Sequence, residues 1–217
     1  KTAFNKIIKF TKELEADGHE IKNIDLGGGV GINYLNSKES DIFLKDYTDL
    51  IKYVSKKTNK KIIIEPGRYL LGNTGILVTK VLYKKTEGIK KFLIVDAGMN
   101  NLMRPALYNA VHQIGMIKKK IIKNYNYNKY EVVGPICETA DVLVKDAKLN
   151  RAVKQDDILF IEKVGAYGSS MASSYNSKDL ANEVMVNKNK FSLIRKKIST
   201  DNLLIFEKMP QKWLKIK

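Results

Sequence analysis

The sequence predicts a mixed α/β fold in which an α/β part is followed by a part rich in β-strand. Residues 1–72 alternate helical and strand periodicity, and residues 73–217 carry short β-rich runs separated by polar turns. A strand, helix, strand order is typical of a parallel sheet with covered faces. A chain of 217 residues, 44% of them hydrophobic, is long enough for one large or two small domains. We therefore expect two domains, residues 1–72 and residues 73–217.

The α/β part is predicted to begin with a helix. Apolar residues recur near helical spacing over Phe4–Leu14, and Gly18 supplies a stop signal. A strand is expected in the run IKNIDLGGGVGI, residues 21–32, which ends in glycines. Helical spacing returns over Asp46–Lys57, before a second β-rich run, KKIIIEPGRYL, at residues 60–70.

The second part of the chain has a different character. Its β-rich runs show no convincing helix between them, and we expect a strand in each. These runs are Gly75–Lys85, Lys91–Asp96, Tyr130–Val133, Ala140–Val144 and Asp157–Lys163. The polar stretch of residues 117–131 is expected to be a mobile or edge segment. Beyond Ser169 we expect the chain to turn helical.

Composition excludes several classes of protein. No stretch approaches the roughly 20 uninterrupted apolar residues of a membrane span, and the N-terminal segment lacks the apolar block and cleavage site of a secretory signal. The single cysteine, Cys137, excludes an internal disulfide framework and favours a reducing compartment. We therefore expect a cytoplasmic protein without a membrane partner.

The formal net charge of +16 could indicate nucleic-acid binding, because clustered Lys and Arg neutralise phosphates. The distribution of charge argues against this. Only four of the 39 basic residues are arginines, the lysines are scattered among many Asn and Ile residues, and aromatic interleaving is missing. Such a mixture is typical of an AT-rich genome, so we expect no nucleic-acid partner. A nucleic-acid binder would instead show salt-sensitive binding to random oligonucleotides.

A run of glycines follows the first predicted strand. Gly27, Gly28 and Gly29, with Gly31 close behind, could bring backbone N–H groups close to a phosphate. A tight turn at a strand end explains the run equally well. The G-x-G-x-x-G spacing of dinucleotide sites, with an acid about 20 residues on, is not met.

The EPGR motif at residues 65–68 is a stronger indication of a site. It places an acid, a turn and a planar cation at the end of an apolar strand. In a barrel of parallel strands, the carboxyl ends carry the chemistry. Glu65 could keep a ring nitrogen protonated, and the Arg68 fork could bind a phosphate or carboxylate. A structural partner role for Glu65 is the alternative.

Five ordered motifs resemble the C-terminal half of the diaminopimelate decarboxylases, members of the alanine racemase and ornithine decarboxylase superfamily (fold type III). The motifs are DLGGGVGI, EPGR, DAGMNNLMRPALY, GPICETAD and GAYGSSMASSYN. The resemblance covers nearly the whole chain and implies a pyridoxal 5′-phosphate cofactor. For residues 1–72 it implies the C-terminal part of a TIM (β/α)8 barrel, followed by a domain resembling a β-barrel or sandwich. The implied activity is decarboxylation of meso-2,6-diaminopimelate to L-lysine and carbon dioxide, the last step of lysine biosynthesis.

The resemblance also implies a role for individual positions. The implied cofactor-binding residues are Gly28, Gly29, Glu65, Pro66, Gly67, Arg68 and Tyr167. The implied substrate-binding residues are Arg68, Arg104, Tyr108, Glu138 and Tyr167, with no metal ligand. Cys137 resembles the family's catalytic proton donor. In this family Cys137 and Glu138 serve the cofactor of the neighbouring subunit, which implies a homodimer with shared active sites.

Arg104 and Glu138 suit the chemistry of the implied substrate. Meso-diaminopimelate carries an amino-acid group at each end, so a specific site needs a cation for the distal carboxylate and an anion for the distal ammonium. Arginine offers a bidentate planar geometry that lysine lacks, which explains Arg104 in an expected loop of a lysine-rich chain. An ordinary surface arginine is the alternative.

Cys137 lies in a turn-like stretch after Gly134 and Pro135, and an acid follows it. Decarboxylation requires an acid that returns a proton to the carbon, and thiols are mostly protonated at neutral pH. The alternative for an isolated cysteine is a small buried hydrophobic residue.

The resemblance places the family's Schiff-base lysine and cofactor-stacking histidine upstream of Lys1. His19 lies in an expected helix-to-strand turn and does not match the family's histidine motif. We therefore expect a fragment of a longer chain or a truncated relic, inactive alone. The alternatives are a related decarboxylase of arginine, ornithine or carboxynorspermidine, or a non-catalytic relative. The CETAD and RPALY motifs favour diaminopimelate, because a diamine-type substrate has no distal carboxylate for Arg104.

Overall fold

The computed structural model describes residues 2–35, 40–117 and 126–214. The chain divides into two compact units, each described here by itself. The first unit comprises Lys1–Val78, Val111–Ile117 and Leu159–Tyr167, and the second comprises Thr79–Ala110, Lys118–Ile158 and Gly168–Lys217. The domain boundary expected between residues 72 and 73 remains a prediction.

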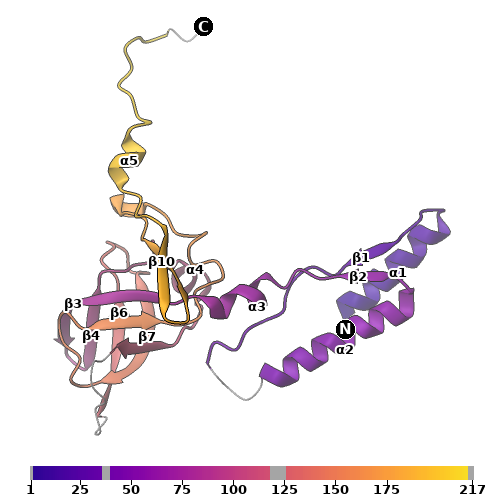
Figure 1. Cartoon of the computed structure of the whole chain (residues 1–217), viewed down its shortest axis with the longest axis horizontal. Helices are drawn as coiled ribbons and strands as arrows, with labels where there is room; N and C mark the ends of the chain where they lie inside the picture. The colour runs from indigo at the N-terminus through magenta and orange to yellow at the C-terminus, as the bar shows by residue number, and fades with distance from the viewer. Residues whose placement is uncertain (1, 36–39, 118–125, 215–217) are drawn as a thin grey trace. The chain divides into compact units, whose positions relative to one another are not determined.

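The first unit begins with the predicted order of helix, strand, helix and strand (Figure 1). These elements are α1 (Thr2–Ala16), β1 (Asn23–Asp25), α2 (Ser40–Thr58) and β2 (Lys61–Ile63). The two strands pair in parallel, and α1 packs against α2. Ile8, Ile24 and Val54 are buried, one on each of α1, β1 and α2. The helical spacing and the apolar runs therefore predicted these elements correctly.

The β-rich run expected at residues 60–70 contains a shorter strand than predicted and, after it, a helix that was not predicted. The strand ends at Ile63, and a short helix, α3 (Gly67–Leu71), begins directly after Pro66. Proline has no N–H for a strand ladder, but it is well suited to the position before a helix, where its carbonyl accepts from Leu70 N at 3.0 Å. A 3₁₀ turn, η1 (Gly72–Thr74), follows.

Two strands from distant parts of the chain complete the first unit. β5 (Ile114–Ile117) neighbours β8 (Ile158–Ile161), and Glu162 N donates to Gln113 O at 2.9 Å. Gly115 is needed here, because a Cβ atom on it would lie 2.6 Å from Cε1 of Phe160.

The second unit is built on four neighbouring strands, as the β-rich runs predicted (Figure 1). They are β3 (Leu77–Glu87), β4 (Lys90–Val95), β6 (Tyr127–Val133) and β7 (Val142–Asn150), hydrogen-bonded in that order. β3 pairs antiparallel with β4, β4 pairs parallel with β6, and β6 pairs antiparallel with β7. Buried Leu93, Tyr130 and Val132 anchor the core of this sheet.

The polar stretch of residues 117–131 is only partly an edge segment. Residues 118–125 lie outside the described part of the chain. From Tyr127 onward the stretch forms β6, which is paired on both sides, with β4 and with β7. Within the stretch, residues 127–130 pair with β7, and Glu131 is the first residue that pairs with β4, so the expectation of an edge holds for residues 127–130.

Two regions of the second unit differ from expectation. A five-residue helix, α4 (Arg104–Tyr108), follows β4, where no helix was predicted. Beyond Ser169 the chain is not mainly helical. It forms η2 (Tyr175–Ser177), an antiparallel hairpin of β9 (Glu183–Asn187) and β10 (Lys190–Arg195), and the short α5 (Thr200–Leu204).

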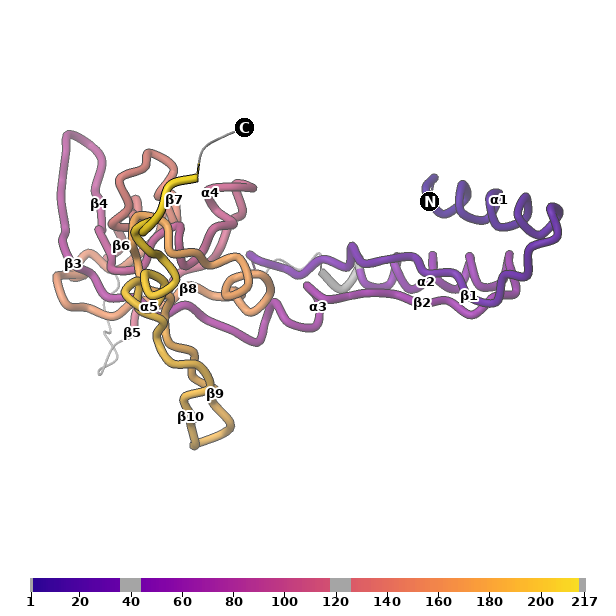
Figure 2. The backbone as a smooth tube through the Cα atoms, turned by 90° about the horizontal axis from the view of Figure 1, so that it is seen from above, coloured from indigo at the N-terminus to yellow at the C-terminus, as the bar shows by residue number. Residues whose placement is uncertain are grey.

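The hairpin explains why the helical expectation failed. β-branched and aromatic residues at Val184, Val186 and Phe191 suit strands, and Lys188, with φ of 55°, lies in the two-residue turn. Figure 2 shows the hairpin extending from its neighbours in the second unit. Among all described residues, no helix has both the length and the apolar character needed to cross a membrane.

Candidate cofactor and substrate sites

The glycine loop after β1 is shaped by backbone conformations that favour glycine. Gly27 and Gly29 have φ values of 68° and 92°, in the left-handed region that other residues rarely adopt. The Asp25 carboxylate fixes the start of the loop, because its Oδ1 accepts a hydrogen bond from Gly27 N at 2.8 Å. At Gly27 and Gly29 the backbone groups of the loop are therefore not covered by a Cβ atom.

Gly28 joins this loop to the EPGR segment. Glu65 N donates to the carbonyl of Gly27 at 2.8 Å, and a Cβ atom on Gly28 would lie 2.8 Å from the carbonyl oxygen of Glu65. Such a contact with rigid backbone leaves no room for a side chain. The structure thus places the backbone of Gly28 beside that of Glu65, and the phosphate and ring-nitrogen roles of these residues remain predictions.

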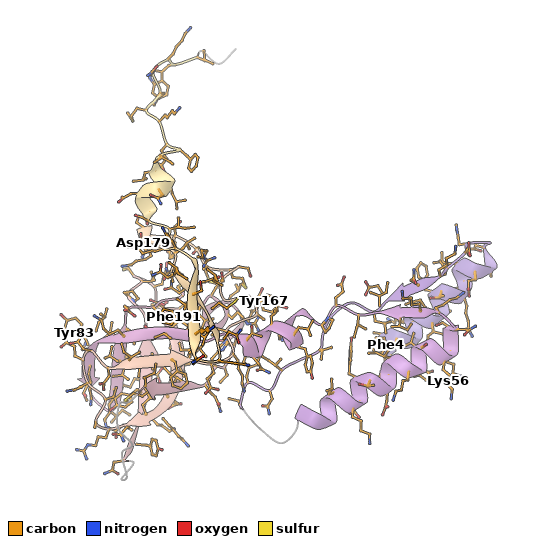
Figure 3. All side chains as sticks on the ribbon, viewed as in Figure 1. Phe4, Lys56, Tyr83, Tyr167, Asp179 and Phe191 are labelled. Atoms are coloured by element: carbon orange, nitrogen blue, oxygen red, sulfur yellow. The ribbon has the colours of Figure 1, made fainter. Side chains whose placement is uncertain are left out.

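The EPGR turn presents Arg68 to Tyr167. Gly67 N donates to Glu65 O at 2.8 Å, and α3 then carries Arg68 in its first turn. The Arg68 guanidinium lies 5.7 Å from the centre of the Tyr167 ring, within the range of a cation–π contact. Tyr167, labelled in Figure 3, has a left-handed φ of 68°. All the predicted cofactor residues, Pro66 and Gly67 included, therefore belong to the first unit.

Tyr47 on α2 is a contact of this loop that the sequence analysis missed. Its hydroxyl donates to the carbonyl of Gly28 at 3.3 Å. Burial raises the pKa of the Tyr47 phenol, and the negative charge of Asp25 raises it further, so the donor proton is retained. The contact could not be predicted, because nothing in a single sequence links a tyrosine of this helix to the glycine loop.

A cavity of about 720 Å³ lies beside the glycine loop within the first unit. Its wall includes Val30 and Gly31, which directly follow the loop, and Tyr69 of α3. Lys163, also on the wall, donates from its ammonium to the carbonyl of Asn33. The cavity has mixed character, with apolar side chains and several polar groups on its wall.

In the second unit, Arg104 begins a helix and is not in a loop. Pro105 occupies the first turn of α4, and left-handed Asn109 ends the helix. Arg104 is 8% exposed, so the alternative of an ordinary surface arginine is wrong. Its guanidinium lies 5.5 Å from the ring centre of Tyr108, four residues on, so these two predicted substrate residues act as one stacked pair.

A buried carboxylate, Asp141, shapes the turn that carries Cys137 and Glu138. Its Oδ2 accepts from Ile136 N at 2.7 Å, and its Oδ1 accepts from Met99 N at 2.6 Å. Burial raises the pKa of Asp141, although these two hydrogen bonds act in the opposite direction. This one side chain ties the 136–141 turn to the loop after β4.

Gly134, before the turn, is required by the same packing. A Cβ atom on Gly134 would lie 2.6 Å from Oδ1 of Asp141 and 2.5 Å from the Cα of Gly98. Cys137 is a free and exposed thiol, so the alternative of a small buried residue is wrong for this chain. Glu138 is exposed beside it.

Glu138 has a partner that the sequence analysis did not select. The hydroxyl of Tyr175 donates to Oε1 of Glu138 at 2.5 Å. Tyr175 and Asp141 both lie inside the motifs quoted above, GAYGSSMASSYN and GPICETAD, which is the only sequence signal for either. Within the second unit the structure thus forms a pair of Arg104 with Tyr108 and a group of Cys137, Glu138 and Tyr175.

Comparison with known proteins agrees with this reading of the motifs. The profile described as "Pyridoxal-dependent decarboxylase, C-terminal sheet domain" matches residues 21–165. The chain belongs to the pyridoxal-dependent decarboxylase family. Among curated relatives, this chain is 40% identical over 214 residues to the diaminopimelate decarboxylase of Zymomonas mobilis, covering 99% of this chain and 49% of that protein. It is 40% identical over 204 residues to that of Aquifex aeolicus, covering 94% and 47%.

Solved structures give the same result. The diaminopimelate decarboxylase of Helicobacter pylori, complexed with L-lysine, matches this chain with a TM-score of 0.81 and 39% identity, covering 94% of this chain and 49% of that one. The enzyme of M. jannaschii, also in complex with L-lysine, matches with a TM-score of 0.82 and 36% identity, covering 95% and 48%. The chain therefore spans about half the length of the relatives it matches.

Proposed function

We propose that the complete gene product containing this decarboxylase chain converts meso-2,6-diaminopimelate to L-lysine and carbon dioxide. The observation that carries the proposal is the likeness to diaminopimelate decarboxylases over nearly all of this chain, at about 40% identity. The exposed Glu138 and the buried Arg104 are consistent with it, because they supply the anion and the cation that the distal end of this substrate needs.

The residues of the first unit fit pyridoxal 5′-phosphate. The left-handed Gly29 and the crowded Gly28 leave a loop whose backbone N–H groups can approach a phosphate. Glu65, locked against this loop, would face the pyridine nitrogen, and Pro66 and Gly67 shape its turn. Arg68 and Tyr167 would bind cofactor or substrate. When bound, the cofactor takes up the electron pair left by the departing carboxylate.

The residues of the second unit supply substrate recognition and a proton. Arg104 and Tyr108 would bind the distal carboxylate, where a planar guanidinium makes two parallel hydrogen bonds. Glu138 would bind the distal ammonium. The exposed Cys137 thiol would donate a proton to the carbon that has lost carbon dioxide, from a turn that Asp141 holds in place.

The architecture and assembly of the complete protein follow the same proposal. The parallel pair of β1 and β2 would belong to a TIM barrel, completed by segments that this chain does not contain. The protein would be a cytoplasmic homodimer in which Cys137 and Glu138 serve the neighbouring subunit's site. A two-fold axis would supply both shared sites reciprocally.

Related decarboxylases of arginine, ornithine or carboxynorspermidine are the alternative. Lysine and arginine decarboxylases of known structure match with TM-scores of 0.67 and 0.68, but at 24% and 19% identity they show only a shared fold. The buried Arg104 favours diaminopimelate, because a simple diamine precursor offers it no distal carboxylate.

Complementation of a lysine auxotroph tests the proposal. A bacterial strain lacking diaminopimelate decarboxylase should grow without added lysine when it expresses the complete gene product. Expression of the Cys137→Ala variant should restore growth poorly, although the protein accumulates to the same level. Lack of growth with the soluble wild-type protein would contradict the proposed activity.

A further inference from the structure

Tyr175 contacts Glu138 across two segments that are far apart in the sequence. The Tyr175 hydroxyl lies 2.5 Å from Oε1 of Glu138, although the two residues are 37 positions apart. Glu138 lies in the turn between β6 and β7, and Tyr175 is the first residue of η2. Both side chains are exposed, and Tyr175 keeps 44% of its surface accessible. The pair is therefore open to a ligand.

The backbone on the tyrosine side is anchored. Ser173 N donates to the carbonyl of Asn100 at 2.9 Å, which attaches the segment to the loop after β4. Directly after Tyr175, Asn176 and Ser177 both have left-handed φ values, 55° and 54°. A turn with this conformation persists only where its surroundings fix it. Tyr175 is thus directed toward Glu138 by its own segment.

The backbone on the glutamate side is anchored to the same loop. Asp141 holds Ile136 N and Met99 N, and Asp141 N donates to Glu138 O at 3.1 Å. Two segments that are both attached to the loop after β4 therefore meet at the hydrogen bond between Tyr175 and Glu138. A side chain held in one rotamer before binding loses less conformational freedom when the ligand arrives.

We propose that Tyr175 is a positioning residue that sets substrate specificity by orienting Glu138. Its hydroxyl holds Oε1, so that Oε2 is directed to the distal ammonium of the substrate. This inference rests on the proposed function, because it takes the ammonium of meso-diaminopimelate as the ligand of Glu138.

The choice of tyrosine has a chemical reason. A lysine or arginine at this place would neutralise Glu138 and compete with the substrate ammonium, whereas a neutral phenol orients the carboxylate and leaves its charge intact. The hydrogen bond to Glu138 raises the pKa of the Tyr175 phenol, and the negative charge of Glu138 adds to this effect. Tyr175 therefore remains a neutral donor throughout the physiological pH range.

Steady-state kinetics of the complete gene product test the inference. Tyr175→Phe should raise KM for meso-diaminopimelate about 3- to 10-fold, the effect of one lost hydrogen bond, and should leave kcat within about 2-fold. Tyr83→Phe, at an exposed tyrosine of β3 (Figure 3), is the matched control and should leave both constants unchanged. On a Glu138→Gln background, Tyr175→Phe should change KM less than about 2-fold, because the orienting role is already lost.

A titration measures the pair without using activity. With tyrosines carrying ¹³C at Cζ, the Tyr175 signal is assigned by its loss in Tyr175→Phe. Its pKa should be higher in the wild type than in Glu138→Gln. An equal pKa in both proteins would overturn the inference. If the wild type decarboxylates meso-diaminopimelate and Tyr175→Phe has the same KM, the inference is overturned and the proposed function stands. If the wild type releases no carbon dioxide, the proposed function itself is overturned.

Discussion

At the scale of single residues, Asp141 explains how an exposed turn holds Cys137 and Glu138 in place. It is only 3% exposed, and its two carboxylate oxygens satisfy two backbone N–H groups from different segments. Removal of such an acceptor leaves buried donors without a partner, which costs more than the hydrogen bonds themselves contribute. The turn that carries Cys137 and Glu138 therefore depends on this residue.

We predict that Asp141→Ala destabilises the protein by about 1–3 kcal/mol for each of the two orphaned N–H groups. Because the folded state raises the pKa of Asp141, its contribution is largest below the ordinary aspartate pKa of 3.8 and declines as the pH rises through the raised value. Urea unfolding of both proteins at several pH values measures this. The stability difference between wild type and variant should narrow with rising pH, and a difference that widens would contradict the account.

A second residue-scale prediction concerns Arg104→Lys. Lysine keeps the charge but loses the planar fork and the stacking on Tyr108, so KM for meso-diaminopimelate should rise about 10- to 100-fold. The absorbance of the bound cofactor should be unchanged, because the residues proposed to bind the cofactor belong to the other unit. Arg151→Lys, at an exposed turn, is the matched control. Equal KM values for Arg104→Lys and wild type would show that Arg104 does not bind substrate.

At the scale of elements, close approach of backbones decides where glycine is required. A Cβ atom on Gly165 would meet the carbonyl of Leu71 and lie 2.8 Å from Gly75 N, both of which are rigid backbone. A Cβ atom on Gly72 would instead meet the terminal methyl group of Ile32, which can rotate away. The backbone of the α3–η1 segment therefore packs rigidly against Gly165, whereas its contact with Ile32 can adjust.

This difference predicts that two similar substitutions change the stability of the protein to different extents. Gly165→Ala should destabilise the protein by about 1–3 kcal/mol through overpacking. Gly72→Ala, in a helical conformation, should stay within about 1 kcal/mol of the wild type, because alanine favours the helix. Thermal unfolding of both variants provides the comparison. Equal losses of stability would mean that the Gly165 contact is not rigid.

Elements were predictable where local pattern and tertiary contact agree. The helical spacing of α1 and α2 and the β-rich runs of the sheet predicted those elements, because their apolar faces are also their buried faces. α4 was missed since five residues around Pro105 carry no periodicity. The candidate site residues from the glycine loop to Glu138 were predicted from the motifs. Tyr47, Asp141 and Tyr175 were not, because each contacts a residue 19 to 42 positions away in the sequence, which no local pattern reveals.

At the scale of the whole molecule, each unit exposes apolar surface. In the first unit Leu70 and Leu71 of α3 are 62% and 54% exposed, and β1 and β2 form a two-stranded sheet among the described residues. In the second unit Val186 and Phe191 of the hairpin are 70% and 81% exposed. Phe191 is labelled in Figure 3. Open strand edges and exposed apolar side chains promote association.

We therefore predict that these 217 residues, expressed alone, self-associate and release no carbon dioxide from meso-diaminopimelate. Light scattering and the fluorescence of a hydrophobic dye should both rise with protein concentration. Phe191→Ser should reduce both signals, whereas Tyr83→Ser should reduce them less, because Tyr83 has a polar hydroxyl already. A monodisperse, dye-silent chain would contradict this prediction.

The most direct test of the central claim is the release of carbon dioxide by the complete gene product supplied with pyridoxal 5′-phosphate. Meso-diaminopimelate and ornithine are assayed separately at equal concentration, with lysine measured as the second product. The account predicts equal amounts of carbon dioxide and L-lysine from meso-diaminopimelate and negligible release from ornithine, which has no distal carboxylate for Arg104. Equal turnover of the two substrates, or turnover of ornithine alone, would contradict it.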